Sequence, residues 1–162
     1  MKLIRFYGQP NIEKCRNRFA KDVQNNGGRM NKKNENSVNI VTEEDGIPVL
    51  YPECVRGFGV RVVNPQNPKA PSKDLSANIV YIAPGGILEP HRHENEEVYI
   101  IVEGNGIGYF GLEQPVEISK DMFLHFPSNA IHGIKNTSGS MMKIVTVNSP
   151  PVGHIPEWKT NS

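Results

Sequence analysis

From residue 38 onward, the chain consists of short apolar runs separated by glycine, proline and other turn residues. The runs are rich in β-branched and aromatic residues, as β-strands are. Ten runs can be read, at 38–41, 47–51, 57–63, 77–83, 97–103, 106–111, 115–119, 122–126, 132–136 and 141–148. Strands do not alternate with helical stretches, which argues against a Rossmann-type fold. The pattern predicts an all-β sandwich or barrel.

The two ends of the chain differ from this β-rich region. Apolar residues at spacings of three and four predict an amphipathic helix at 11–24; they are Ile12, Cys15, Phe19 and Val23. An asparagine-rich stretch without periodicity follows and predicts a linker. The tail has three prolines, so it cannot continue the interior of a sheet. We therefore expect an N-terminal helical segment and linker (1–40), a β-barrel domain (41–148) and a C-terminal tail (149–162).

Composition excludes several classes of protein. The 162 residues suit one domain, and the formal net charge of +1 lacks the basic bias that nucleic-acid binding needs. No apolar run approaches the ~20 residues that cross a bilayer, and the first residues do not resemble a signal peptide. Cys15 and Cys54 are isolated, although a single disulfide between them stays open. These features predict a cytoplasmic protein without nucleic-acid or membrane partners.

A dense group of polar residues lies in "GGILEPHRHENEEVYIIVEG", residues 85–104. His91, His93, Glu97 and Tyr99 are all odd-numbered, and residues an even number apart face the same side of a strand. An unbroken strand would therefore present two imidazoles, a carboxylate and a phenol on one inward face. Two histidines and a carboxylate suit a metal ion, whereas the alternative is a solvated strand end. Candidates for a further ligand are His125, His132 and His154, and His132 is well placed after a proline turn.

Two motifs resemble the sequence signature of the cupin superfamily. The first motif is glycine, five residues, His-x-His, three residues, glutamate, six residues and glycine. It is matched at every position, by Gly85, His91, His93, Glu97 and Gly104. The second motif is matched by Pro127, His132 and Asn136, while Asp121 and Asn129 replace its two glycines. Asparagine tolerates the left-handed backbone that glycine usually supplies, so Asp121 is the stronger departure.

The resemblance covers roughly residues 77–147 and implies a double-stranded β-helix, a jelly-roll-like barrel. It also implies one divalent transition-metal ion held by His91, His93, Glu97 and His132. These ligands suit Mn, Fe, Ni, Co or Zn, and the affinity order alone does not choose among them. Barrels of this family usually pair, so we expect a homodimer. The outward residues Val98, Ile100 and Val102 fit such an interface.

With this fold and these metal ligands, we expect a small metal-dependent enzyme of isomerase, lyase, decarboxylase or dioxygenase type. Its substrate would be a small polar compound, either a sugar derivative or an oxygenated carboxylate. Tyr99 and His125 are the candidate catalytic residues for proton transfer; their structural alternatives are a barrel-lining aromatic and a hydrogen-bonded core histidine. Arg61 and Tyr81 are candidates for binding an anionic group. The alternative function is a non-catalytic cupin that binds or senses a small molecule.

Overall fold

The computed structural model describes residues 38–111 and 114–151. The chain divides into two units, Met1–Val38 and Asn39–Ser162, and all the secondary structure described here belongs to the second unit. The predicted helix at 11–24, the linker and most of the tail lie outside the described residues. The predicted domain boundaries therefore stay predictions. Within the described part, no helix is long and apolar enough to cross a membrane.

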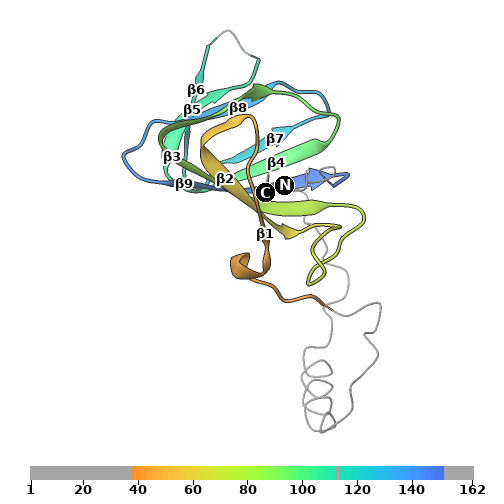
Figure 1. The fold of residues 1–162 in the computed structure, drawn as a ribbon. Helices are drawn as coiled ribbons and strands as arrows, with labels where there is room; N and C mark the ends of the chain where they lie inside the picture. The colour runs from red at the N-terminus through yellow and green to blue at the C-terminus, as the bar shows by residue number, and fades with distance from the viewer. Residues whose placement is uncertain (1–37, 112–113, 152–162) are drawn as a thin grey trace, which may run out of the picture. The chain divides into compact units, whose positions relative to one another are not determined.

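The second unit contains one curled sheet in which every strand pair is antiparallel (Figure 1). Its nine strands are β1 (Ile47–Val49), β2 (Cys54–Val63), β3 (Ser76–His91), β4 (Glu96–Glu103), β5 (Asn105–Tyr109), β6 (Val116–Ser119), β7 (Phe123–Phe126), β8 (His132–Asn136) and β9 (Met142–Ser149). The order is β6-β5-β8-β3-β9-β4-β7, and β2 pairs with both β3 and β1. The all-β prediction is confirmed.

The prediction of a strand at 38–41 is wrong. Residues 38–42 have no regular structure, and Val38 and Ile40 are 85% and 91% exposed. A short 3-10 helix, η1 (Glu43–Asp45), follows instead, and the Thr42 N–H donates to Asp45 Oδ2 over 2.9 Å. Apolar composition alone does not make a strand when no neighbouring strand supplies hydrogen-bond partners.

Strand β3 is much longer than the predicted strand at 77–83. Its first part pairs with β9 and its last part pairs with β8. Between these parts, residues 83–86 of β3 lie opposite the single residue Arg56 of β2. Gly85 has φ +70, a conformation that glycine adopts without strain. This irregular stretch redirects β3 and carries His91 to the polar end of the barrel.

The inside of the barrel changes from apolar to polar along three neighbouring strands. Alternate residues of β3, β4 and β9 are buried and face inward. At one end these residues are apolar; they include Ile82, Ile101, Met142 and Ile144. Further along they are polar; they include Ser76, Asn78, Glu97, Thr146 and Asn148. Because the strands are paired in register, the polar residues lie side by side.

The apolar end holds a well-formed core. Buried members of this cluster include Cys54, Leu88, Ile118, Phe126 and Ile134. Cys54 is a free thiol in the structure, and burial raises its pKa to about 11. Cys15, with which a disulfide was left open, lies outside the described residues. On the opposite face of β4, Val98, Ile100 and Val102 point outward as predicted and are half-buried.

Candidate metal centre

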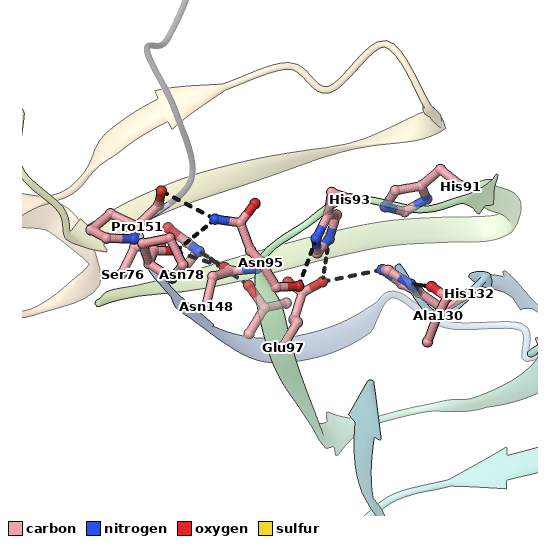
Figure 2. Close-up of polar contacts among 12 residues, drawn as sticks. Ser76, Asn78, His91, His93, Asn95, Glu97, Ala130, His132, Asn148 and Pro151 are labelled. Atoms are coloured by element: carbon pink, nitrogen blue, oxygen red, sulfur yellow. Dashed lines mark hydrogen bonds and ion pairs between the residues drawn. The ribbon is translucent and has the colours of Figure 1, made fainter. Parts of the chain in front are cut away.

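Three histidines from separate segments converge at the polar end of the barrel (Figure 2). His91 ends β3, His93 lies in the segment between β3 and β4, and His132 begins β8. Their ligand nitrogens all lie within 4.8 Å of one another. The prediction of one unbroken strand through these positions is wrong, because residues 92–95 lie outside any strand and the chain bends at 94–95. Convergence arises instead because β8 pairs His132 directly with His91.

Each imidazole is held by the same kind of hydrogen bond. Nδ1 lies 2.7 Å from the Glu89 carbonyl oxygen in His91, 3.0 Å from that of Asn95 in His93, and 2.8 Å from that of Ala130 in His132. A carbonyl oxygen only accepts, so each Nδ1 carries the proton and donates it. The Nε2 lone pair of each neutral ring is then available to a metal ion. This arrangement is usual for metal-binding histidines.

The carboxylate of Glu97 completes the cluster. Its Oε2 lies 3.0 Å from His93 Nε2 and 3.2 Å from His132 Nε2. Burial alone would raise the pKa of Glu97, but hydrogen bonds from His132, His93 and Asn148 lower this pKa to about 2. The ionised carboxylate therefore lies beside two Nε2 atoms inside the protein.

The two more exposed histidines have different electrostatic surroundings. Burial lowers the pKa of His91, and the nearby His132 and His93 lower it further. In contrast, the hydrogen bond with Glu97 raises the pKa of His93. His132 is 1% exposed, and its ring stacks on Phe126 with centroids 4.4 Å apart. This stacking and the Ala130 carbonyl together fix the orientation of His132.

Two turns adopt a left-handed backbone at the positions where the second motif usually has glycine. Asp121 and Asn129 have φ values of +70 and +63, so both adopt the conformation that glycine would adopt there. The Asn129 N–H donates to the His93 carbonyl oxygen over 2.8 Å. This bond ties the loop before β8 to the segment that contains His93. Neither replacement disrupts the turn that it occupies.

The two candidates for proton transfer lie on opposite faces of the sheet. Tyr99 faces inward, lines the pocket and is 3% exposed. Burial raises its pKa well above the usual range, and the adjacent Glu97 raises it further. His125 instead pairs with the outward Val98, and its Nε2 lies 2.7 Å from Glu96 Oε1. The structure therefore brings Tyr99, but not His125, together with the histidine cluster, and the expectation of a core position for His125 is wrong.

A cavity of about 220 Å3 opens beside His91, His93, Glu97 and Tyr99. Its other polar lining residues are Tyr51, Glu53, Asn78, Arg92, Thr146 and Asn148. These six residues were not among the site residues predicted from the sequence. Strand alternation could have found three of them, because Asn78, Thr146 and Asn148 occupy inward positions in otherwise apolar strands. No local pattern marks Tyr51, which precedes β2 and reaches the pocket only in the folded chain.

Comparisons with known proteins agree with this architecture. Residues 78–148 match the family model described as "Cupin domain". The chain is similar to auxin-binding protein T85 of Nicotiana tabacum, with 29% identity over 91 residues, or 49% of each chain. It is also similar to dimethylsulfoniopropionate lyase DddW of Ruegeria pomeroyi, with 37% identity over 65 residues, 40% of this chain and 42% of that one. The chain spans about half the length of the curated relatives it matches.

A solved structure shares the fold across most of the described region. The polyketide cyclase RemF from Streptomyces resistomycificus matches with a TM-score of 0.61 and 16% sequence identity. The match covers 70% of this chain and 80% of that chain. The likeness confirms the predicted jelly-roll-like barrel.

Proposed function

Because this chain is a small protein of the cupin superfamily, we propose that it is a metal-dependent enzyme acting on a small polar compound. Its metal ligands would be His91, His93, Glu97 and His132. The observation that carries the proposal is the common orientation of the three histidines, each with Nδ1 bonded to a carbonyl oxygen. Such bonds fix the tautomer and direct Nε2 towards a shared point.

The protonation of the cluster supports a bound cation. With Nδ1 donating to a carbonyl, Nε2 of His93 or His132 can donate to Glu97 only if the ring carries a second proton. Satisfying both contacts would therefore require two imidazolium rings beside one carboxylate. A divalent ion accepts electron pairs from all these groups at once and fits the donor set without the extra protons. One carboxylate and three imidazoles suit Mn, Fe, Ni, Co or Zn.

The bound ion would supply Lewis acidity to an oxygen-containing substrate. The reaction would be isomerisation, elimination, decarboxylation or dioxygenation of a sugar derivative or an oxygenated carboxylate. Tyr99 is the candidate for moving a proton, because its hydroxyl lies beside Glu97 at the pocket. His125 is a weaker candidate, since it lies on the outer face and bonds Glu96.

The relatives support two kinds of function. The similarity to a dimethylsulfoniopropionate lyase favours an enzyme, as does the fold shared with a polyketide cyclase. The similarity to auxin-binding proteins favours the alternative, a non-catalytic cupin that binds or senses a small molecule. We favour the enzyme because the potential ligand set is intact, and a pure binder does not require all four residues.

Metal analysis of the purified protein tests the ligand assignment. We expect about one divalent ion per chain in the wild type and a strong loss of metal in His91→Ala and His132→Ala. His125→Ala is the matched control, because it removes an imidazole from the outer face. Full metal retention in both cluster variants would refute the assignment.

Turnover assays separate the two functions. The metal-loaded protein would be incubated with a panel of sugars, keto acids and amino-acid derivatives, with and without oxygen, and product formation would be followed by mass spectrometry. Conversion of a panel member supports the enzyme. Thermal shifts with several ligands and no conversion of any of them would favour the binding protein.

The expected partners also belong to this proposal. We propose that a second copy of the chain covers the outward apolar residues of β4 and its neighbours, which gives a homodimer. The expected cytoplasmic setting, without nucleic-acid or membrane partners, rests on the near-neutral charge and the isolated cysteines. Only Cys54 of these two lies in the described region, where it is a free thiol.

A further inference from the structure

The three histidines of the cluster are not held in the same way. His91 belongs to β3, and the ring of His132 is buried and stacks on Phe126. In contrast, His93 lies outside any strand, and its side chain is 27% exposed. The rings that His93 meets among the described residues are those of the other two histidines. Its position therefore depends on the hydrogen bonds made by its own segment.

Two hydrogen bonds hold the segment that contains His93. The Asn129 N–H donates to the His93 carbonyl oxygen over 2.8 Å, which fixes the backbone. His93 Nδ1 donates to the Asn95 carbonyl oxygen over 3.0 Å, which fixes the ring. The other ring nitrogen, Nε2, is the proposed ligand atom. In the metal-bound protein, the Asn95 carbonyl oxygen would therefore be the acceptor that orients this imidazole.

The end of the ladder between β4 and β9 leaves this carbonyl oxygen available. Glu96 pairs with Ser149, the last residue of β9. The next two residues are Pro150 and Pro151, which have no N–H group, so backbone pairing cannot continue beyond Ser149. For the same reason, Pro150 cannot donate to the Asn95 carbonyl oxygen, which remains free to accept from the imidazole.

The side chain of Asn95 makes the link that the backbone cannot make. Its Nδ2 donates to the Pro150 carbonyl oxygen over 2.7 Å and lies 3.4 Å from the Pro151 carbonyl oxygen. Figure 2 shows this amide between Pro151 and the histidine cluster. Carbonyl oxygens only accept, so these partners fix which end of the Asn95 amide carries the nitrogen. A half-buried residue outside any strand is thereby anchored to the end of β9.

We propose that Asn95 is a positioning residue of the metal centre that couples the first residues of the C-terminal tail to the ligand His93. Its side chain is anchored at Pro150 and Pro151, and its backbone carbonyl holds His93 Nδ1. The inference rests on the proposed function, because it treats His93 as a metal ligand. It adds a determinant of metal affinity that coordinates no metal and does not line the cavity.

Cobalt(II) binding tests this role through Asn95→Ala, which removes the amide but keeps the backbone carbonyl. We expect cobalt affinity, measured by competition with a chromophoric chelator, to fall about tenfold, the lower end for changes to the partners of metal ligands. Asn95→Gln keeps an amide donor and should recover most of this loss. Asn105→Ala is the matched control and should bind cobalt as the wild type does. Asn105 is an exposed asparagine of β5 whose side chain has no hydrogen bond within the described residues.

Proton NMR of the cobalt-loaded protein separates positioning from a general loss of structure. Each of the three Nδ1–H protons should give an exchangeable, paramagnetically shifted resonance. In Asn95→Ala, we expect one of the three to exchange with solvent faster and the other two to keep their wild-type rates. Unchanged affinity with three unchanged resonances would overturn the inference. An equal change in all three resonances, or an equal loss of affinity in Asn105→Ala, would overturn it as well.

The metal-free protein distinguishes a failure of this inference from a failure of the proposed function. Nitrogen-15 NMR of labelled histidine reports which ring nitrogen carries the proton. We expect His93 to lose its fixed Nδ1–H form in Asn95→Ala, while His91 and His132 keep theirs. If the wild type binds no cobalt but this change occurs, the proposed function is refuted and the positioning role stands. If the wild type binds cobalt and Asn95→Ala alters neither the rings nor the affinity, the reverse holds.

Discussion

At the residue scale, the protein keeps an ionised carboxylate among three imidazoles inside a folded barrel. Glu97 is 5% exposed, and the imidazoles around it have their Nδ1 atoms engaged by carbonyl oxygens. The cluster is therefore rigid before any ligand arrives, because neither ring rotation nor tautomer exchange is free. Rigid placement of this kind lowers the cost of ordering side chains on metal binding.

Most of the metal affinity that Glu97 contributes should come from its negative charge. Glu97→Gln keeps the shape but removes the negative charge, so we expect metal affinity to fall by at least about tenfold, the lower end for changes around metal sites. Competition with a chromophoric chelator measures this change. Glu96→Gln is the control, because Glu96 is an exposed neighbour on the opposite face of β4. Equal affinity in the two variants would show that Glu97 is not a ligand.

The sequence predicted the identity of these residues better than their route into the site. The rule that residues an even number apart share a strand face placed Glu97 and Tyr99 correctly, because both lie within β4. It placed His91 and His93 on the same side for the wrong reason, since residues 92–95 are not part of a strand and separate His91 from β4. The amides Asn78 and Asn148 were missed, because the pairing of β3 with β9 brings them together although they are 70 positions apart in the sequence. No local pattern contains that register.

At the scale of the elements, the meeting of β3 and β8 decides whether the histidines converge. Gly133 follows His132, and a Cβ atom there would lie 2.7 Å from the Pro90 backbone nitrogen and 2.9 Å from the Leu88 carbonyl oxygen. Backbone atoms cannot yield as a flexible side chain can. The absence of a side chain at this position is therefore what allows β8 to carry His132 up to His91.

Gly133→Ala should separate the two strands and weaken the site. We expect a loss of about 1–3 kcal/mol in the free energy of unfolding, typical of overpacking, together with lower metal affinity. Urea denaturation and metal titration measure the two effects. Gly139→Ala is the matched control, because no atom lies within 4 Å of the Cβ it would add. If both variants behave alike, close packing at Gly133 is not what sets the histidine geometry.

A second element-level contact attaches η1 to the outer face of the sheet. The Tyr81 hydroxyl donates to Glu43 Oε1 over 2.6 Å, and Lys143 Nζ lies 3.1 Å from Glu43 Oε2. Hydrogen bonds from Tyr81 and then Lys143 lower the pKa of Glu43. Tyr81 is thus engaged on the outer face, away from the pocket, and does not serve the anion-binding role considered for it.

This contact predicts a pH dependence of stability. A carboxyl whose pKa is lower in the folded state stabilises the protein above its unfolded pKa, and this contribution disappears as the pH falls through the folded pKa. We therefore expect wild-type stability to exceed that of Glu43→Gln near neutral pH by less than about 1 kcal/mol, since the contact is partly exposed. The difference should shrink as the pH falls below the ordinary glutamate pKa and vanish below the lowered pKa of the folded state. Thermal denaturation of both proteins across pH measures it, and a difference that grows in acid would contradict the assignment.

The fold itself could largely be predicted from the sequence, with two exceptions at this scale. Nine of the ten apolar runs became strands, because alternation and turn residues are local signals. The run at 38–41 did not, since none of the strands in the described part of the chain pairs with it. Strand β3 continued beyond residue 83 through two glycines, because β2 and β8 supply partners there. Pairing across the sheet decided both cases.

At the scale of the whole molecule, the sheet has a polar pocket on one face and a row of apolar side chains on the other. In register across β3, β9, β4 and β7, the row consists of Ile79, Val145, Ile100 and Phe123. Phe123 is 71% exposed, a costly position for a phenylalanine in contact with water. A two-fold dimer would bury the same row from both copies, as isologous interfaces do.

The predicted homodimer can be tested through Phe123. We expect light scattering after size exclusion to give the mass of two chains for the wild type, and of one chain for Phe123→Glu, because a buried unpaired charge at the centre of an apolar interface is strongly unfavourable. Val116→Glu is the control: it adds the same charge at an exposed apolar residue of β6, outside the row, and should stay dimeric. Both sites are exposed, so neither change should unfold the barrel. A monomeric wild type, or a dimer that tolerates Phe123→Glu, would refute this interface while leaving the metal site and its pocket untouched, since these lie on the opposite face of the sheet.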